Sequence, residues 1–103
     1  MSASHSILVI DDDPHILTMV YEVLAADLYQ IFTAPNGSEG LTLYDQVHPN
    51  LVLSDIMLPD ILGLDLCRQI KQKNPTQLFV FMSSLSSDLD QVVGLELGAD
   101  DYL

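Results

Sequence analysis

The stretch LVLSDIMLPD, residues 51–60, starts like the inside of a sheet and ends on a carboxylate. Its first four residues are apolar apart from Ser54, which is typical of a strand covered on both faces in a parallel sheet. The apolar run stops at Asp55, and Pro59 marks a turn. In open parallel sheets, ligands bind just beyond the carboxyl ends of the strands. Asp55 is therefore a candidate functional residue, although a solvated strand end would explain it equally well if it stood alone.

Similar apolar runs recur along the chain and alternate with longer segments of helical period. The other runs are ILVI at 7–10, YQIFTA at 29–34, LFVFM at 78–82 and a short DYL at 101–103. Such alternation is typical of a parallel sheet wrapped by helices. The sequence therefore predicts an α/β fold.

Four helices are predicted between these runs from residues that recur on one helical face. Their inward residues are Leu17, Val20 and Leu24 in the first, Leu41 and Tyr44 in the second (37–47), Leu62, Leu66 and Ile70 in the third, and Val92, Val93 and Leu97 in the fourth. Asp13 before Pro14 predicts an N-cap followed by proline at the first helical position. Gly40 weakens the second helix, because glycine inside a helix costs about 1 kcal/mol relative to alanine.

Composition limits the possible functions. Because 103 residues form one small core but not two, we expect a single domain spanning residues 1–103. With 3 Lys+Arg against 15 Asp+Glu, the net charge of -12 repels nucleic acid and acidic membranes and attracts cations or a basic partner. The single cysteine, Cys67, cannot form an internal disulfide, and the chain starts without a signal peptide. No apolar run approaches the ~20 residues of a membrane helix, so we expect a cytoplasmic protein.

A second group of carboxylates follows the first predicted strand. Asp11, Asp12 and Asp13 come directly after ILVI, and a helix N-cap needs only one of them. If the first and third strands are neighbours, Asp11, Asp12 and Asp55 meet in one pocket, where protonation or a cation must relieve their repulsion. Oxygen ligands without a Cys or His cluster suit Mg²⁺ better than Zn²⁺.

Four motifs follow one another along the chain: ILVIDDDP (7–14), LVLSDIMLPD followed by Gly63, the hydroxyl residue Ser83 after the fourth strand, and LGADDYL (97–103). Together they resemble the receiver domain of bacterial two-component response regulators. The resemblance covers nearly the whole chain. It implies a flavodoxin-like (CheY-like) fold with a parallel sheet in the order 2-1-3-4-5. It also implies that a sensor histidine kinase transfers a phosphoryl group to this domain, which catalyses only its own phosphorylation and is not a turnover enzyme.

The resemblance assigns roles to individual positions. Asp55 matches the phosphorylation site, Asp11 and Asp12 match the acids that hold Mg²⁺ together with Asp55, and Met57 matches the position whose backbone carbonyl is a further ligand. The switch hydroxyl and the switch aromatic fall on Ser83 and Tyr102. A phosphoryl group brings a charge of about -1.5 to -2. An inward hydrogen bond from the Ser83 hydroxyl would let the Tyr102 ring turn in and change the surface near the fourth helix and fifth strand.

The chain departs from the family pattern at its end. The family's lysine, followed by proline, would come two residues after Leu103, and the fifth helix would come later still. We therefore expect a domain incomplete at its C-terminus, with one sheet face short of a helix or covered by a second copy in a homodimer. Metal binding should survive, whereas phosphorylation should be slow or fail to drive the switch. A lost output domain would be the part that binds DNA.

Two other functions fit some of the same residues. A Mg²⁺-dependent phosphatase of the haloacid-dehalogenase type would use Asp11 and Asp13, but that family has Gly-Thr where this chain has Pro14-His15. Multiple turnover abolished by Asp11→Asn and spared by Asp55→Asn would identify it. The other alternative is a pseudo-receiver, a binding module that keeps the fold without being phosphorylated. The full acidic triad argues against it, although the missing lysine would make this chain behave like one.

Overall fold

The computed structural model describes residues 5–26, 29–82 and 101–102. The predicted fourth helix, with Val92, Val93 and Leu97, and the switch residue Ser83 lie outside this range. The backbone of Tyr102 is described, but its side chain is not.

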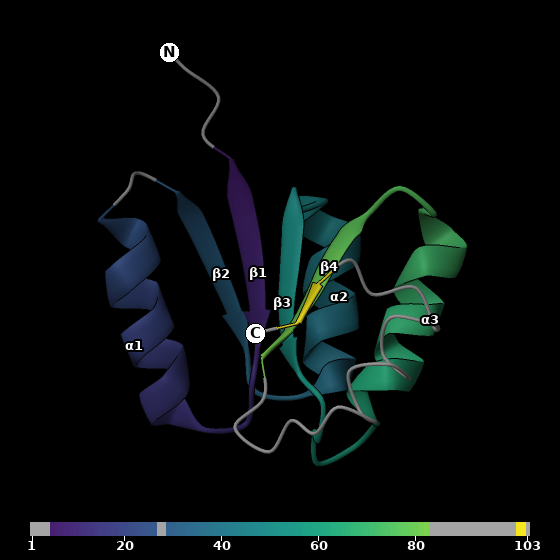
Figure 1. Cartoon of the computed structure of the whole chain (residues 1–103), viewed down its shortest axis with the longest axis horizontal. Coiled ribbons are helices and arrows are strands. Elements are labelled where there is room, and N and C mark those ends of the chain that lie inside the picture. The colour runs from purple at the N-terminus through teal and green to yellow at the C-terminus, as the bar shows by residue number, and fades with distance from the viewer. Residues whose placement is uncertain (1–4, 27–28, 83–100, 103) are drawn as a thin grey trace.

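Five parallel strands form one sheet, and they correspond to the apolar runs of the sequence (Figure 1). They are β1 (Ser6–Ile10), β2 (Gln30–Ala34), β3 (Leu51–Asp55), β4 (Leu78–Met82) and the two-residue β5 (Asp101–Tyr102). Their order is β2-β1-β3-β4-β5, which confirms the predicted topology. The strand that follows β1 in the chain, β2, lies on one side of it, whereas β3 lies on the other side. The carboxyl ends of β1 and β3 are therefore neighbours at the point where the order of the strands switches sides.

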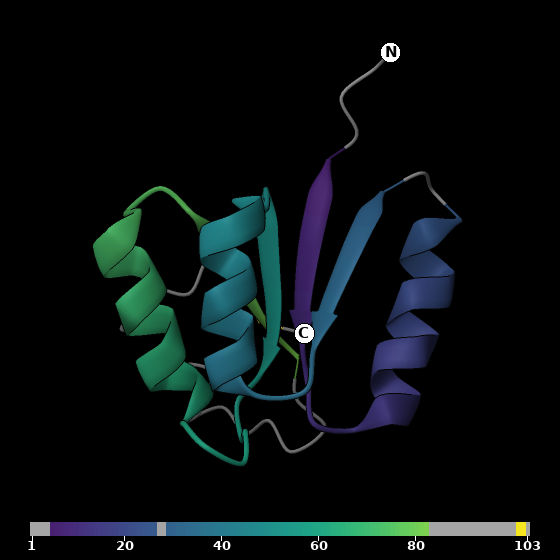
Figure 2. The same ribbon diagram turned by 180° about the vertical axis from the view of Figure 1, so that it is seen from behind.

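Within the described ranges, three helices cover the two faces of the sheet. They are α1 (Pro14–Ala25), α2 (Gly37–Val47) and α3 (Gly63–Lys73). The helices α2 and α3 lie on one face and α1 on the other, as Figures 1 and 2 show from opposite sides. No helix in the described part of the chain has the length and apolar character needed to cross a bilayer.

Helix α1 begins as the sequence predicts, whereas α3 begins later. The Asp13 side chain accepts a hydrogen bond from the backbone N–H of His15, and Pro14 occupies the first turn. Leu62 was expected on the inward face of the third helix, and this is wrong. It is the N-cap residue of α3, its backbone is extended, and 49% of its surface is exposed. The apolar pattern starts in the loop, so periodicity placed the helix start too early.

The core has two layers, because alternate strand residues point to opposite faces of the sheet. Leu8, Ile10, Phe79 and Phe81 are among the buried residues beneath α2 and α3. On the α1 face the buried residues are Ile7, Val9 and Leu53, and the inward residues of α1 are only partly buried. A pocket of about 290 Å³ opens there. It is lined by Met19, Val20, Val23, Leu24, Leu53 and Met82.

Gly40 lets α2 pack closely on the sheet. It is buried, and a Cβ atom at this position would lie 2.6 Å from Cδ1 of Ile10 on β1. The cost in helix propensity noted above is therefore offset by a close approach of α2 to β1 that a larger residue would prevent. This packing fixes the start of α2 beside the carboxyl ends of the strands.

Candidate metal centre

The acidic residues predicted to converge lie together at the carboxyl edge of the sheet. Ile10 on β1 pairs with Ser54 on β3, so the next residues along the two strands, Asp11 and Asp55, end at the same edge. Each of Asp11, Asp12 and Asp55 offers a carboxylate oxygen, and these oxygens lie within 4.8 Å of one another. Three anionic groups from two separate strands thus share one small volume.

The three side chains differ in their exposure to solvent. Asp11 is buried, with 5% of its surface exposed, whereas Asp55 is partly buried and Asp12 is exposed. Burial raises the pKa of Asp11, and repulsion from Asp55 and Asp12 raises it further. Burial also raises the pKa of Asp55, with a smaller contribution from Asp12. Both effects disfavour the charged forms, so an added cation would relieve an existing electrostatic cost.

Backbone contacts hold the buried Asp11 and the partly buried Asp55 in place. The Asp13 N–H donates to Oδ1 of Asp11 over 2.9 Å, and the Asp11 N–H donates to the carbonyl of Ala34 at the end of β2 over 3.1 Å. Hydrogen bonds from the backbone of Ile56 and Met57 lower the pKa of Asp55 and partly offset the effect of burial. These bonds orient the carboxylates before any ligand arrives.

The loop from Asp55 to α3 is tightly folded. Met57 and Leu62 form an isolated antiparallel bridge, and the Gly63 N–H donates to the carbonyl of Ile56. A Cβ atom at Gly63 would lie 2.3 Å from the backbone oxygen of Asp55, so only glycine fits at this turn. The Met57 side chain is exposed, and its backbone stands two residues beyond Asp55. Its role as a carbonyl ligand stays a prediction.

The donor set fits a hard divalent cation. The cluster contains only carboxylate oxygens, and the ions that prefer such ligands are Mg²⁺, Ca²⁺ and Mn²⁺. Two of the three acids are held partly desolvated at positions where their charges repel. Asp11, Asp12 and Asp55, with the backbone carbonyl of Met57, are the groups that would hold the ion.

Two predicted switch residues are not placed beside this cluster. Ser83 lies outside the described residues. The backbone of Tyr102 pairs with Phe81, which puts β5 next to β4 at the sheet edge, but the structure does not describe its side chain.

Sequence reasoning missed Asp60. It lies between Pro59 and Gly63, and its carboxylate accepts hydrogen bonds from the backbone N–H groups of Gly37 and Ser38 over 2.9 and 2.8 Å. The available signal was a second acid in the loop that follows Asp55. Its partners are more than twenty residues away in the chain, so local patterning could not identify them.

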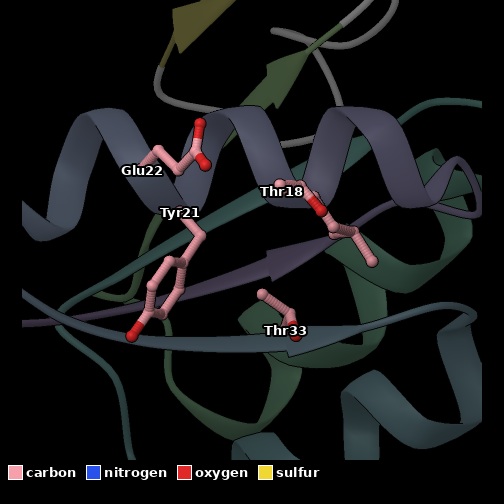
Figure 3. A pocket seen from close by; sticks show the side chains of 5 residues that line it. Thr18, Tyr21, Glu22 and Thr33 are labelled. Carbon is pink, nitrogen blue, oxygen red and sulfur yellow. The ribbon is translucent and has the colours of Figure 1, made fainter.

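A different cavity, of about 300 Å³, lies between α1 and β2 (Figure 3). It is lined by Leu17, Thr18, Tyr21, Glu22 and Thr33. Figure 3 shows Tyr21 reaching from α1 towards β2, on which Thr33 lies. None of the three clustered aspartates lines this cavity, so it is separate from the candidate metal centre.

Known proteins that are similar to this chain belong to one family. Residues 7–103 match the model of the response regulator receiver domain family. The chain is 36% identical over 97 residues to the alkaline phosphatase synthesis transcriptional regulatory protein PhoP of Bacillus subtilis, a match that covers 94% of this chain and 40% of that protein. It is 38% identical over 97 residues to the DNA-binding response regulator MtrA of Mycolicibacterium smegmatis, covering 94% of this chain and 42% of MtrA. The chain thus spans less than half the length of these relatives.

Solved structures share the fold. The BeF3-activated N-terminal receiver domain of Klebsiella pneumoniae RstA superposes with a TM-score of 0.90 at 32% identity, over 96% of this chain and 84% of that one. A putative response regulator from Chloroflexus aurantiacus gives a TM-score of 0.92 at 29% identity, over 98% and 84% of the two chains.

Proposed function

The chain belongs to the response regulator receiver domain family, and on this basis we propose that Asp55 accepts a phosphoryl group from a sensor histidine kinase. One observation carries the proposal. The carboxylates of Asp11, Asp12 and Asp55 meet within 4.8 Å at the switch point of a parallel sheet. An acid that served only to solvate the end of a strand would be exposed and away from like charges, whereas Asp55 is partly buried beside two other carboxylates.

Each residue has a distinct task in this proposal. Asp55 is the nucleophile, and the backbone of Ile56 and Met57 holds its carboxylate in position. A bond forms between an Asp55 oxygen and phosphorus, and the bond from phosphorus to the donor breaks. Asp11 and Asp12 would hold Mg²⁺ together with Asp55 and the carbonyl of Met57. When bound, Mg²⁺ screens the repulsion between the carboxylate and the phosphoryl oxygens. Positioning then supplies most of the rate, and the domain catalyses only its own phosphorylation.

The product changes the charge beside β4. The added group carries about -1.5 to -2 charge and three acceptor oxygens. We assign Ser83 as the hydroxyl that donates to it and Tyr102 as the ring that follows, so that the surface near the fourth helix and β5 changes. The chain's net charge of -12 argues against direct contact with nucleic acid.

The same assignment proposes where the domain acts and with what. We propose that the domain acts in a cytoplasmic two-component pathway, that its partner is a histidine kinase, and that it forms a homodimer. MtrA is described as a DNA-binding response regulator. Because this chain matches only 42% of MtrA, we place DNA binding in the part of such a protein outside the matched region.

The phosphatase alternative is not favoured, because the receiver family model covers residues 7–103. Labelling with a small phosphodonor such as phosphoramidate tests the proposal against both alternatives. We expect slow labelling at a single position, mapped by mass spectrometry to Asp55, dependent on Mg²⁺ and absent in Asp55→Asn. A chain that is never labelled is a pseudo-receiver. Turnover of a phosphomonoester that survives Asp55→Asn would instead identify a phosphatase.

A further inference from the structure

Asp60 links the loop after the phosphoacceptor to a different helix. We propose that Asp60 is a positioning residue, which anchors the loop between β3 and α3 to the first turn of α2 and so fixes the Met57 backbone beside Asp55. This inference rests on the proposed function, because it assigns Met57 a place in the metal centre. Asp60 itself does not touch the acidic cluster.

Both oxygens of the Asp60 carboxylate are used in this anchor. Oδ1 accepts from the Gly37 N–H over 2.9 Å, and Oδ2 accepts from the Ser38 N–H over 2.8 Å. These N–H groups belong to the first turn of α2, where they have no partner within the helix. The Asn36 side chain caps the next free donor by accepting from the Glu39 N–H over 2.8 Å. Asp60 therefore completes the cap of α2 from outside the helix.

Packing next to Asp60 makes the same junction tight. A Cβ atom at Gly37 would lie 2.1 Å from Cγ2 of Ile61, so α2 and the loop touch where only glycine fits. Ile61 is partly buried against the core beneath α2 and α3. The two hydrogen bonds lower the pKa of Asp60, which keeps the carboxylate charged over a wider pH range.

The anchored loop is short and closed. The bridge between Met57 and Leu62 leaves four residues, 58–61, in the turn between them. Leu58 is buried in the core, so it fixes one side of this turn. Asp60 fixes the other side by polar contacts. With both sides held, we infer that the Met57 backbone is restrained as well, since it pairs with Leu62 at the base of this turn.

The anchor also connects the ends of three strands. Helix α2 follows β2 closely, and the last residue of β2, Ala34, accepts a hydrogen bond from the Asp11 N–H over 3.1 Å. Asp60 extends this link to the loop that follows β3. The groups expected to hold the metal come from β1 and β3. Asp60 ties the β3 side to the start of α2, and the Asp11 N–H ties the β1 side to the end of β2, just before that helix.

Mg²⁺ affinity, measured by calorimetry on folded variants of this chain, tests the proposal. Asp60→Ala removes both acceptors, so the Met57 backbone loses its fixed position, and we expect Mg²⁺ binding to weaken by about tenfold, the lower end of the range for residues that orient metal ligands. Asp60→Asn keeps one acceptor oxygen and nearly the same shape, so we expect a partial loss. The matched control is Asp65→Ala, which removes the same charge from an exposed ion pair with Arg68 on α3.

A structural role alone would lower stability and leave the affinity of the folded chain unchanged. We therefore also follow the backbone amide signal of Met57 by NMR, which should shift in Asp60→Ala and stay in place in Asp65→Ala. Equal Mg²⁺ affinity in the Asp60 and Asp65 variants would overturn the proposal, and Asp60→Asn decides the matter if Asp60→Ala does not fold. An unmodified chain that does not bind Mg²⁺ would overturn it as well. Phosphodonor labelling absent from Asp55 despite normal Mg²⁺ binding would refute only the proposed function.

Discussion

Burial separates Asp11 and Asp55 from most other acids in the described part of the chain. Both have a raised pKa, because each loses solvent in a cluster where like charges repel. Asp60 shows the opposite effect, since two backbone N–H groups stabilise its charged form and lower its pKa. Residues of one type thus serve as candidate ligands in one place and as an anchor in another, according to the groups they face.

The raised pKa of Asp11 predicts that ionisation of this carboxyl lowers the free energy of unfolding of the metal-free chain near neutral pH. A carboxyl whose pKa is higher in the folded than in the unfolded chain adds stability below the unfolded value of 3.8, and this stability is lost as pH rises through the folded value. In EDTA near neutral pH, Asp11→Asn should therefore unfold at a higher urea concentration than the unmodified chain. The difference should vanish below pH 3.8.

Removing any one charge relieves some repulsion in a chain of net charge -12, so Asp65→Asn on the exposed side of α3 is the control. The stabilisation by Asp11→Asn should exceed that of the control. It should reverse in excess Mg²⁺, because the ion stabilises the folded chain that keeps all its ligands. A variant no more stable than the control in EDTA would contradict the assigned cause.

Sequence identified the residues that follow strands directly. Asp11, Asp12 and Asp55 each stand at or just beyond the end of an apolar run, so predicting the strands also predicted where the acids lie. Asp60 could not be predicted in this way. Its position depends on how the loop after β3 meets the start of α2, a contact between segments far apart in the chain.

At the scale of single elements, α2 shows how packing overrides propensity. Helix propensity alone predicts that Gly40→Ala stabilises the chain by about 1 kcal/mol. The methyl group would lie 2.6 Å from Cδ1 of Ile10, which is completely buried and has little room to move. Overpacking a core usually costs about 1–3 kcal/mol, which exceeds the gain from propensity, so we predict a net loss of up to about 2 kcal/mol. Urea unfolding measures it.

The double variant Gly40→Ala with Ile10→Val isolates the clash. Ile10→Val removes the Cδ1 atom at a cost of about 0.5–1.5 kcal/mol on its own. If the contact with Cδ1 of Ile10 limits how closely α2 can pack on β1, the double variant should lose less stability than the sum of the two single changes. Simple additivity, or a more stable Gly40→Ala chain, would show that α2 has space at this point.

Element boundaries were harder to predict than the elements themselves. The N-cap at Asp13 follows from local chemistry, because an acid before proline satisfies the first turn of a helix. Leu62 continues the apolar pattern of α3 backwards into the loop, but the Met57 bridge keeps its backbone extended. That bridge is a contact formed by the folded loop, and helical periodicity contains no information about it.

For the molecule as a whole, the two sheet faces are unequally covered by the described helices. Leu66 on α3 is completely buried, whereas Leu17 on α1 is only partly buried. Leu66→Ala should therefore cost about 2–5 kcal/mol of unfolding free energy, the range for core leucines. Leu17→Ala should cost less than half as much. Both changes replace leucine by alanine in a helix, so each is a matched control for the other, and equal costs in urea unfolding would contradict the unequal packing.

The class of fold followed from physical patterning, but the order of the strands did not. Alternating apolar runs and helical segments predict a parallel sheet. The order β2-β1-β3-β4-β5 came from the resemblance of ILVIDDDP and LVLSDIMLPD to a known family, and the structure confirms it. The convergence of Asp11 and Asp55 depends on β1 and β3 being neighbours, which no single segment determines.

Mg²⁺ titration followed through every backbone amide signal of the unmodified chain tests most directly whether one ion binds among the three acids. We predict a saturable change with one ion per chain, with the largest shifts confined to residues 10–13 and 54–57 at the ends of β1 and β3. The shifts should persist at high salt, which screens loose binding to a surface of net charge -12. Weak shifts spread over all acidic residues, or none at the ends of β1 and β3, would contradict the metal centre and the phosphoacceptor role that depends on it.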